Sequence, residues 1–105
     1  MTTIACTLDD YNRGTRRERW VALASRALIG IETTERGLRL VFATESGVEQ
    51  ELLELAALER DCCAFATWAV TTTGNRIALD IAGRSADAIP AVQGMFVPLR
   101  DLLPT

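Results

Sequence analysis

Residues 67–83, TWAVTTTGNRIALDIAG, contain the clearest structural pattern in the chain. Two stretches rich in apolar and β-branched residues flank the dipeptide Gly74-Asn75, and this arrangement predicts a β-hairpin that turns there. Three aliphatic residues recur at every second position of the second stretch: Ile77, Leu79 and Ile81. Successive side chains of a strand point to opposite faces, so these three form its inward face.

A second hairpin is predicted upstream, over residues 31–43, IETTERGLRLVFA. Gly37 is expected to supply its turn. Leu38, Leu40 and Phe42 alternate with more exposed positions, which marks one face of this hairpin as buried too. A further short strand is expected at the start of the chain, in the stretch TIACTL, residues 3–8.

Three stretches show helical spacing of apolar residues instead. The first covers roughly residues 9–28, with Gly30 as its stop, and the second runs from about Val48 to Phe65. The third starts near Ser85 or Asp87 and is kinked or ended by Pro98. Its apolar stripe consists of Ile89, Val92, Phe96, Leu99 and Leu103.

The predicted order of elements is therefore β-α-β-β-α-β-β-α. Hairpins mixed with helices are typical of an α+β fold, here a two-layer sandwich with one antiparallel-rich sheet and helices on one face. The first six elements also match the ferredoxin-like order, which is the alternative fold. A chain of 105 residues without an internal linker is expected to form a single α+β domain over residues 1–105.

The composition of the chain argues against several classes of function. The formal net charge is −3, so nucleic acid is not the expected partner, because phosphate binding needs a basic surface. The N-terminal sequence lacks the pattern of a signal peptide and no stretch reaches the length of a membrane span, so we expect a cytoplasmic protein with no membrane partner. The chain contains no histidine, which excludes a Ser-His or Cys-His catalytic pair. No catalytic residue is assigned.

The candidate site lies in residues 58–65, LERDCCAF. On a helical wheel Cys62 and Cys63 lie on either side of the centre of the apolar stripe, and Glu59 falls between them. A carboxylate facing the core must be paired or protonated. Glu59 is therefore expected to serve the two thiols, to reach solvent at the helix edge, or to pair with an arginine such as Arg16 or Arg39.

Adjacent thiols have a limited chemistry. The Cα atoms of Cys62 and Cys63 are about 3.8 Å apart, below the usual disulfide range of about 4.4–6.8 Å. A helix C-terminus and a neighbouring carboxylate both disfavour the thiolate, which argues against a fast nucleophile. A soft metal ion overcomes this obstacle, because the metal itself displaces the proton.

The leading hypothesis is a soft-metal or metalloid site for Cu(I), Hg(II) or As(III), formed by Cys6, Cys62 and Cys63 with Glu59 in support. Zinc fits less well, because structural zinc sites use four ligands, usually with Cys-x-x-Cys spacing. No metal is required for folding. Two alternatives remain: a thiol redox protein that uses Cys6 with Cys62 or Cys63 and a thiol partner, and a structural or homodimerisation domain whose cysteines fill the core.

The stretch LERDCCAFATW, residues 58–68, resembles a sequence box in a group of small, largely uncharacterised bacterial proteins. That box reads glutamate-arginine, then Cys-Cys-Pro-Phe, then an aromatic residue three positions on. This chain has Ala64 at the proline position and Trp68 where phenylalanine is usual. The matching positions are Cys6, Glu59, Cys62, Cys63 and Phe65. Some members are associated with heavy-metal resistance, so the resemblance implies a role in metal or thiol stress.

Overall fold

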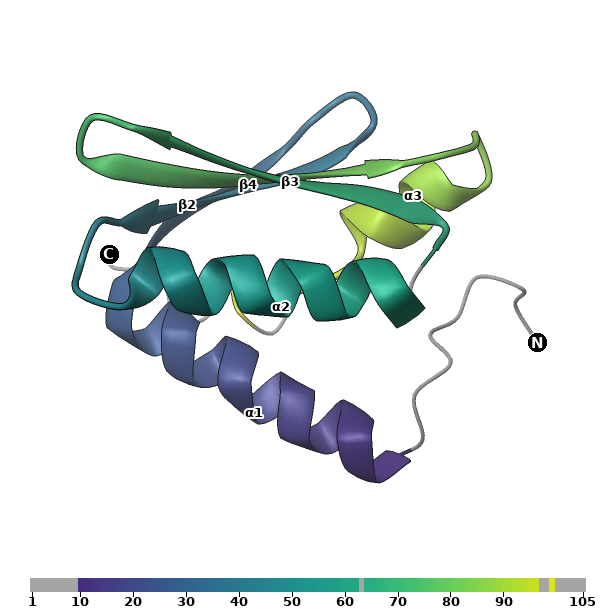
Figure 1. The fold of residues 1–105 in the computed structure, drawn as a ribbon. Helices are drawn as coiled ribbons and strands as arrows, with labels where there is room; N and C mark the ends of the chain where they lie inside the picture. Colours follow the sequence, from purple (N-terminus) through teal and green to yellow (C-terminus); the bar gives the residue numbers. More distant parts are fainter. Residues whose placement is uncertain (1–9, 63, 97–98, 100–105) are drawn as a thin grey trace.

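The structure, a computed structural model, describes residues 10–62, 64–96 and 99. Four strands form one antiparallel sheet in the order β1-β2-β4-β3, and three helices lie on one side of it (Figure 1). The elements are α1 (Asp10–Ala27), β1 (Leu28–Thr33), β2 (Gly37–Ala43), α2 (Val48–Cys62), β3 (Ala66–Thr73), β4 (Arg76–Gly83) and α3 (Ala88–Gln93). This arrangement confirms the predicted two-layer α+β fold.

The downstream hairpin forms as predicted. β3 and β4 pair along their whole length and are joined by the two-residue turn Gly74-Asn75. Gly74 has a φ of +56°, a backbone conformation that glycine adopts without steric cost. The predicted inward residues of β4 are 0–1% exposed, so this strand supplies the middle of the core.

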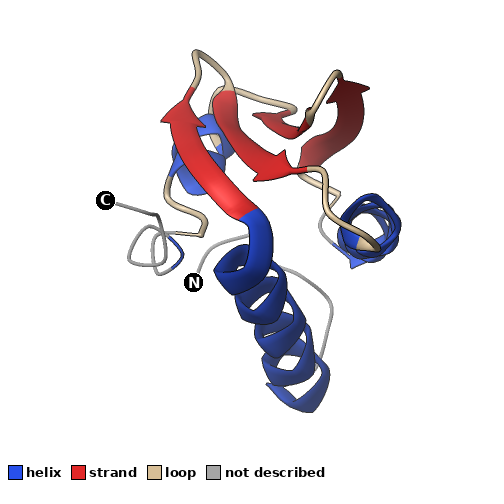
Figure 2. Cartoon of the chain, turned by 90° about the vertical axis from the view of Figure 1, so that its left-hand side faces the viewer, coloured by secondary structure: helices blue, strands red, loops and turns tan. Residues whose placement is uncertain are grey.

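The upstream hairpin begins earlier than predicted. α1 passes directly into β1 at Leu28, without a loop, so Gly30 lies inside the strand rather than at the helix stop (Figure 2). Leu28 is the last residue of the first predicted helix, but its backbone pairs with Phe42 of β2. The side chain of Leu28 is buried in the core. Its backbone pairing with β2, rather than its burial, therefore determines where α1 ends.

Gly37 has a different role from the one predicted. It does not occupy the turn but begins β2, where a Cβ atom would lie 2.0 Å from the carbonyl oxygen of Ile81 and 2.7 Å from Cγ1 of Val92. Real Cβ atoms do not approach other atoms this closely. The glycine is therefore explained by the tight contact of β2 with β4 and α3.

The last helix is shorter than predicted. α3 ends at Gln93 and is followed by a turn, before the chain reaches Pro98. Phe96 adopts a φ of +59°, which takes it out of the helical path. Leu99 is still buried, at 3% exposure, but it does not belong to a continuous helical stripe. Pro98 and Leu103 lie outside the described residues.

The second helix carries the core face that the wheel predicts, with Val48, Leu52, Leu55 and Ala56 fully buried. It ends three residues earlier than expected, at Cys62, and residues 64–65 form the turn into β3. This early end matters for function, because it makes Cys62 the last residue of α2.

The ferredoxin-like alternative does not hold. That arrangement pairs the third predicted strand with the first and the second. The third predicted strand is β2, and it pairs with β1 on one edge and β4 on the other. A strand has only two edges, so β4 occupies the position that the alternative assigns to the predicted strand at residues 3–8. Those residues lie outside the described part of the chain.

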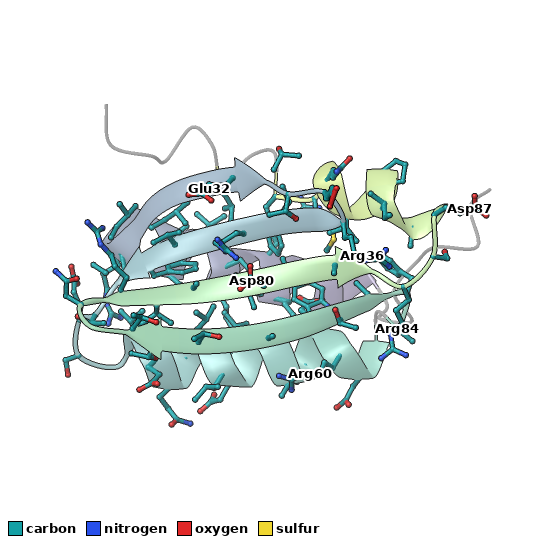
Figure 3. All side chains as sticks on the ribbon, turned by 90° about the horizontal axis from the view of Figure 1, so that it is seen from above. Glu32, Arg36, Arg60, Asp80, Arg84 and Asp87 are labelled. Atoms are coloured by element: carbon teal, nitrogen blue, oxygen red, sulfur yellow. The ribbon has the colours of Figure 1, made fainter. Side chains whose placement is uncertain are left out.

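The outer face of the sheet carries no helix from the described residues (Figure 3). Asp80 lies on this face, where its carboxylate accepts a hydrogen bond of 2.7 Å from Nε of Arg39. The core therefore lies between the inner face of the sheet and the helices. None of the helices in the described part of the chain has the length and apolar character that a membrane span needs.

Candidate functional site

The structure describes two of the four predicted site residues. Glu59 lies in the last turns of α2, and Cys62 is described by its helical backbone position at the end of the same helix. Cys6 and Cys63 lie outside the described residues. The described part of the chain contains no group of three or more cysteine, aspartate or glutamate residues that could hold a metal ion.

Glu59 points into the core, as the wheel predicts, and is only 7% exposed. Its Oε2 accepts a hydrogen bond of 2.9 Å from the indole Nε1 of Trp20, and its Oε1 lies 3.4 Å from Nη1 of Arg16. Both partners come from α1. A buried carboxylate must be compensated by such contacts, because its desolvation is costly. The partner is thus Arg16, one of the two predicted, while Arg39 pairs with Asp80 instead.

The same helix pair has a second, more exposed ion pair further from the cysteines. Arg19 of α1 donates two parallel hydrogen bonds to Glu51 of α2, at 3.0 and 2.8 Å, and a third of 3.2 Å to Glu54. The hydrogen bonds from Arg19 hold the pKa of Glu51 below its usual value. Two arginines one turn apart on α1 therefore hold α2, and Arg16 does so beside the end of α2 where Cys62 lies.

Trp68 of β3, near the same end of α2, has a buried indole N–H without a hydrogen-bond partner among the described residues. Its side chain is 3% exposed, and its indole Nε1 has no hydrogen-bond partner among the described residues. Leaving a buried donor unpaired costs about 1–3 kcal/mol. Its backbone is held against α2, because Nε of Arg60 donates to the carbonyl oxygen of Trp68 at 3.1 Å. The unpaired indole N–H of Trp68 thus belongs to β3, the strand that packs against the last turn of α2.

Phe96 lies between the two tryptophans. Its ring centroid is 4.9 Å from that of Trp20 and 6.3 Å from that of Trp68, in edge-to-face geometry both times. The positive φ of Phe96 is rare for a bulky residue and persists only where the surroundings hold it. The ring of Phe96 thus packs against both indoles in the core.

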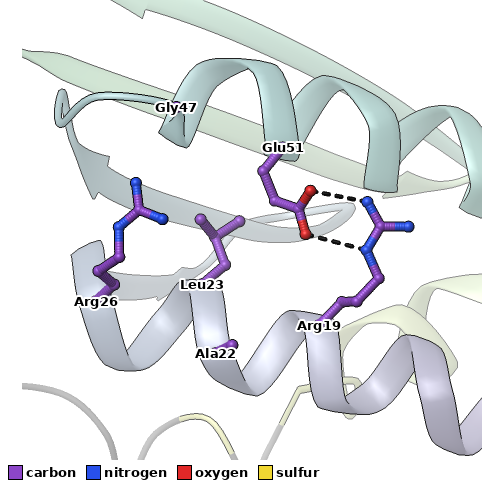
Figure 4. A pocket seen from close by; sticks show the side chains of 6 residues that line it. All are labelled: Arg19, Ala22, Leu23, Arg26, Gly47 and Glu51. Carbon is purple, nitrogen blue, oxygen red and sulfur yellow. Dashed lines mark hydrogen bonds and ion pairs between the residues drawn. The ribbon is translucent and has the colours of Figure 1, made fainter.

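A separate cleft lies at the opposite end of α2 (Figure 4). It has a volume of about 310 Å³ and is lined by Arg19, Ala22, Leu23, Arg26, Gly47 and Glu51. Its two arginines are already engaged, Arg19 with Glu51 and Arg26 with Glu45 and the carbonyl oxygen of Ser46. The cleft therefore offers no unpaired charge to a ligand, and we assign no function to it.

The sequence pattern correctly placed Glu59 on the core side of its helix. It did not indicate a role for the indole N–H groups of Trp20 and Trp68. Trp20 and Trp68 are both buried in the core. The signal that could have revealed more is the indole N–H itself, since a buried tryptophan normally needs an acceptor. Trp20 finds one in Glu59, whereas Trp68 finds none among the described residues. No protein-family model, curated protein or solved structure matches this chain.

Proposed function

We propose that this protein captures a soft, thiophilic metal ion or metalloid through Cys62 and Cys63, with Cys6 as a third thiolate and Glu59 in support. The observation that carries the proposal is the position of Cys62. It ends α2 one turn after Glu59, whose carboxylate is held by Trp20 and Arg16 of α1. The cysteine pair thus begins at a helix end that is tied to the neighbouring helix.

Glu59 supports the site by position rather than as the first metal ligand. Its two oxygens are engaged by Trp20 and Arg16, so a metal ion would have to compete with both. The contacts instead hold the last turn of α2 against α1. A binding group on an ordered helix end loses less conformational freedom on binding than one on a mobile loop.

The chemistry of the donors favours soft ions. Thiolate sulfur prefers Cu(I), Hg(II) and As(III) over hard cations, and the chain has no histidine to complete a usual zinc site. The metal displaces the thiol proton to solvent as each sulfur binds, so capture does not require a free thiolate beforehand. The resemblance of residues 58–68 to a box in proteins associated with heavy-metal resistance points in the same direction.

The test is a binding measurement on the reduced protein with one equivalent of Hg(II), followed by native mass spectrometry against a competing small thiol. Wild type is expected to retain the metal, and a Cys62→Ser, Cys63→Ser variant is expected to lose it. A Cys6→Ser variant is expected to retain it more weakly, because two thiolates remain. Equal retention by wild type and the double variant would overturn the proposal.

The same samples separate the redox alternative. A disulfide between Cys6 and Cys62 or Cys63 after mild peroxide treatment, in a protein that holds no Hg(II), would assign the cysteines to thiol exchange. The homodimer also stays a prediction, to be tested by sedimentation. Val21 and Leu53 are the large apolar residues exposed in the described part of the chain, and single exposed residues of this kind are ordinary on monomers.

A further inference from the structure

We propose that α2 mediates an antiparallel association of this chain with a second copy of itself. The contact surface consists of four exposed residues of the helix, which we call the α2 stripe: Glu49, Leu53, Ala57 and Arg60. This inference goes beyond the proposed function and does not depend on it, because none of the four residues belongs to the proposed metal site. It gives a location to the homodimer that the sequence predicts without one.

The α2 stripe is a continuous surface along one side of the helix. At a rotation of about 100° per residue, Arg60 falls about 20° from Glu49, Leu53 about 40° and Ala57 about 80°. The two middle residues are apolar, and Leu53 is 42% exposed. The stripe therefore has an apolar centre with a negative charge at one end and a positive charge at the other.

Contacts with β3 hold the two charged ends of the stripe. Oε2 of Glu49 accepts a hydrogen bond of 2.7 Å from Oγ1 of Thr72, and Nε of Arg60 donates to the carbonyl oxygen of Trp68. Neither charged side chain forms an ion pair with a described residue. β3 is an edge strand, and Figure 3 shows α2 with Arg60 beyond that edge. Both charges thus remain available to a partner at the side of the sheet.

The order of residues in the stripe is self-complementary in an antiparallel pair. With a two-fold axis at the level of residue 55, Glu49 and Arg60 lie about 9 and 7.5 Å from the axis along the helix, at 1.5 Å per residue. Glu49 of one copy therefore lies opposite Arg60 of the other. Leu53 and Ala57 lie at equal distances of about 3 Å, so the larger side chain meets the smaller one. Two-fold symmetry makes each of these contacts twice.

This charge pattern favours a second copy over an unrelated partner. A uniformly acidic or basic surface would match only one end of the stripe, whereas a copy turned end over end matches both. Antiparallel helices also bring the opposite ends of their dipoles together. One helix of 15 residues offers a small surface, so the association is expected to be weak and reversible.

Val21 provides a contrast within the same molecule. It is the other large apolar residue exposed in the described part of the chain, and it lies on α1. Arg17 precedes it by four residues and Ser25 follows it by four. A copy turned end over end would place Arg17 opposite a neutral residue, so this surface has no matching charges. The residues around Leu53, rather than its exposure alone, therefore support the inference.

The test is sedimentation equilibrium under reducing conditions, which prevent a disulfide between two chains. A concentration range from about 10 μM to about 1 mM suits a small interface. Wild type is expected to change from monomer to dimer across this range without forming larger oligomers, because an isologous contact closes on itself. A wild-type chain that stays monomeric up to the highest concentration would overturn the inference.

Charge exchange tests the antiparallel pairing itself. Glu49→Arg and Arg60→Glu each place like charges opposite one another, and each is expected to raise the dimer Kd by about tenfold or more. The variant that carries both substitutions restores the attraction and should return the Kd close to the wild-type value. Asp87→Arg and Arg17→Glu are the matched controls, since they make the same charge changes at exposed positions outside α2 and should leave the Kd unchanged.

A third variant tests the apolar centre. Leu53→Glu changes an exposed side chain, so the monomer is expected to fold normally by circular dichroism, and the dimer is expected to disappear over the same concentration range. This variant keeps the test decisive even where Arg60→Glu, which loses the contact with Trp68, does not fold. A dimer that persists in Leu53→Glu would show that copies associate through another surface. Failure of the double charge exchange to recover the dimer would exclude the antiparallel pairing.

Discussion

Trp20 and Trp68 offer a comparison within one core. They are 4% and 3% exposed, and both meet the ring of Phe96 edge to face. The indole of Trp20 donates to the buried carboxylate of Glu59, whereas the indole of Trp68 has no acceptor among the described residues. Equal burial therefore does not mean an equal role. One N–H joins two helices, and the other makes no hydrogen bond within the described residues.

The largest expected effect comes from removing the acceptor that Trp20 uses. Glu59→Ala leaves the Trp20 N–H and the Arg16 guanidinium without this buried partner, and the loss of one member of a buried pair costs about 3–5 kcal/mol. Urea unfolding measures this loss. Glu59→Gln is the matched control, because it keeps an acceptor oxygen for Trp20 and should cost less. Equal losses for both variants would show that the hydrogen bond contributes nothing.

The second prediction compares the two tryptophans directly. Trp20→Phe and Trp68→Phe remove the same atoms from equally buried sites, so their packing losses largely cancel in the difference. Trp20→Phe should be more destabilising by about 1.5–3 kcal/mol, since it removes a hydrogen bond to a charged group. The measurement is the difference in free energy of unfolding without metal. A larger loss for Trp68→Phe would contradict the assignment of an unpaired N–H.

A smaller effect is expected at the exposed counterpart of the Glu59 contact. Arg19→Ala removes the paired hydrogen bonds to Glu51, and a pair with this much solvent exposure contributes about 0.2–1 kcal/mol. Arg16→Ala should cost distinctly more, because Arg16 faces the buried Glu59. Equal costs for the two variants would remove the distinction between the buried and exposed ends of this helix pair.

The same exposed pair predicts a modest pH dependence. Arg19 lowers the pKa of Glu51 in the folded state, so the unfolded state binds more protons when the pH falls below the ordinary range of a glutamate. The stability from this pair is complete above the unfolded pKa and is lost as the pH falls through the folded one. Glu51→Gln should therefore flatten the acid side of the stability curve, measured by urea unfolding at successive pH values.

The smallest effect is expected on the outer face of the sheet. Arg39 pairs with Asp80 there with both side chains exposed to solvent, and Arg39→Ala should leave the free energy of unfolding unchanged within error. This variant is the control for Arg16→Ala, because both arginines were candidate partners of Glu59 from the sequence. A clear loss of stability would mean that the outer face is covered in solution.

Local patterns in the sequence determined the hairpin at Gly74-Asn75, the buried faces of β2, β4 and α2, and the inward direction of Glu59. These features depend on the periods of strands and helices, which a single chain segment carries by itself. The ends of the elements were less well predicted. α1 gives way to β1 at Leu28 because pairing with β2 competes with the helix. α3 ends at Gln93, and Phe96 then adopts a positive φ and packs its ring against two tryptophans.

Only the tertiary structure determined the ion-pair partner of Glu59 and the hydrogen-bond acceptors of the two indoles. Arg16 and Arg39 were equivalent candidates for Glu59 in the sequence, and the packing of α1 against α2 selected Arg16. The same packing satisfied the N–H of Trp20 and left that of Trp68 without an acceptor among the described residues. The physical reason is the distance along the sequence over which each effect acts. Periodicity within one segment sets the face on which a side chain lies. A hydrogen bond requires two atoms within about 3 Å, and residues far apart in sequence meet only through the fold.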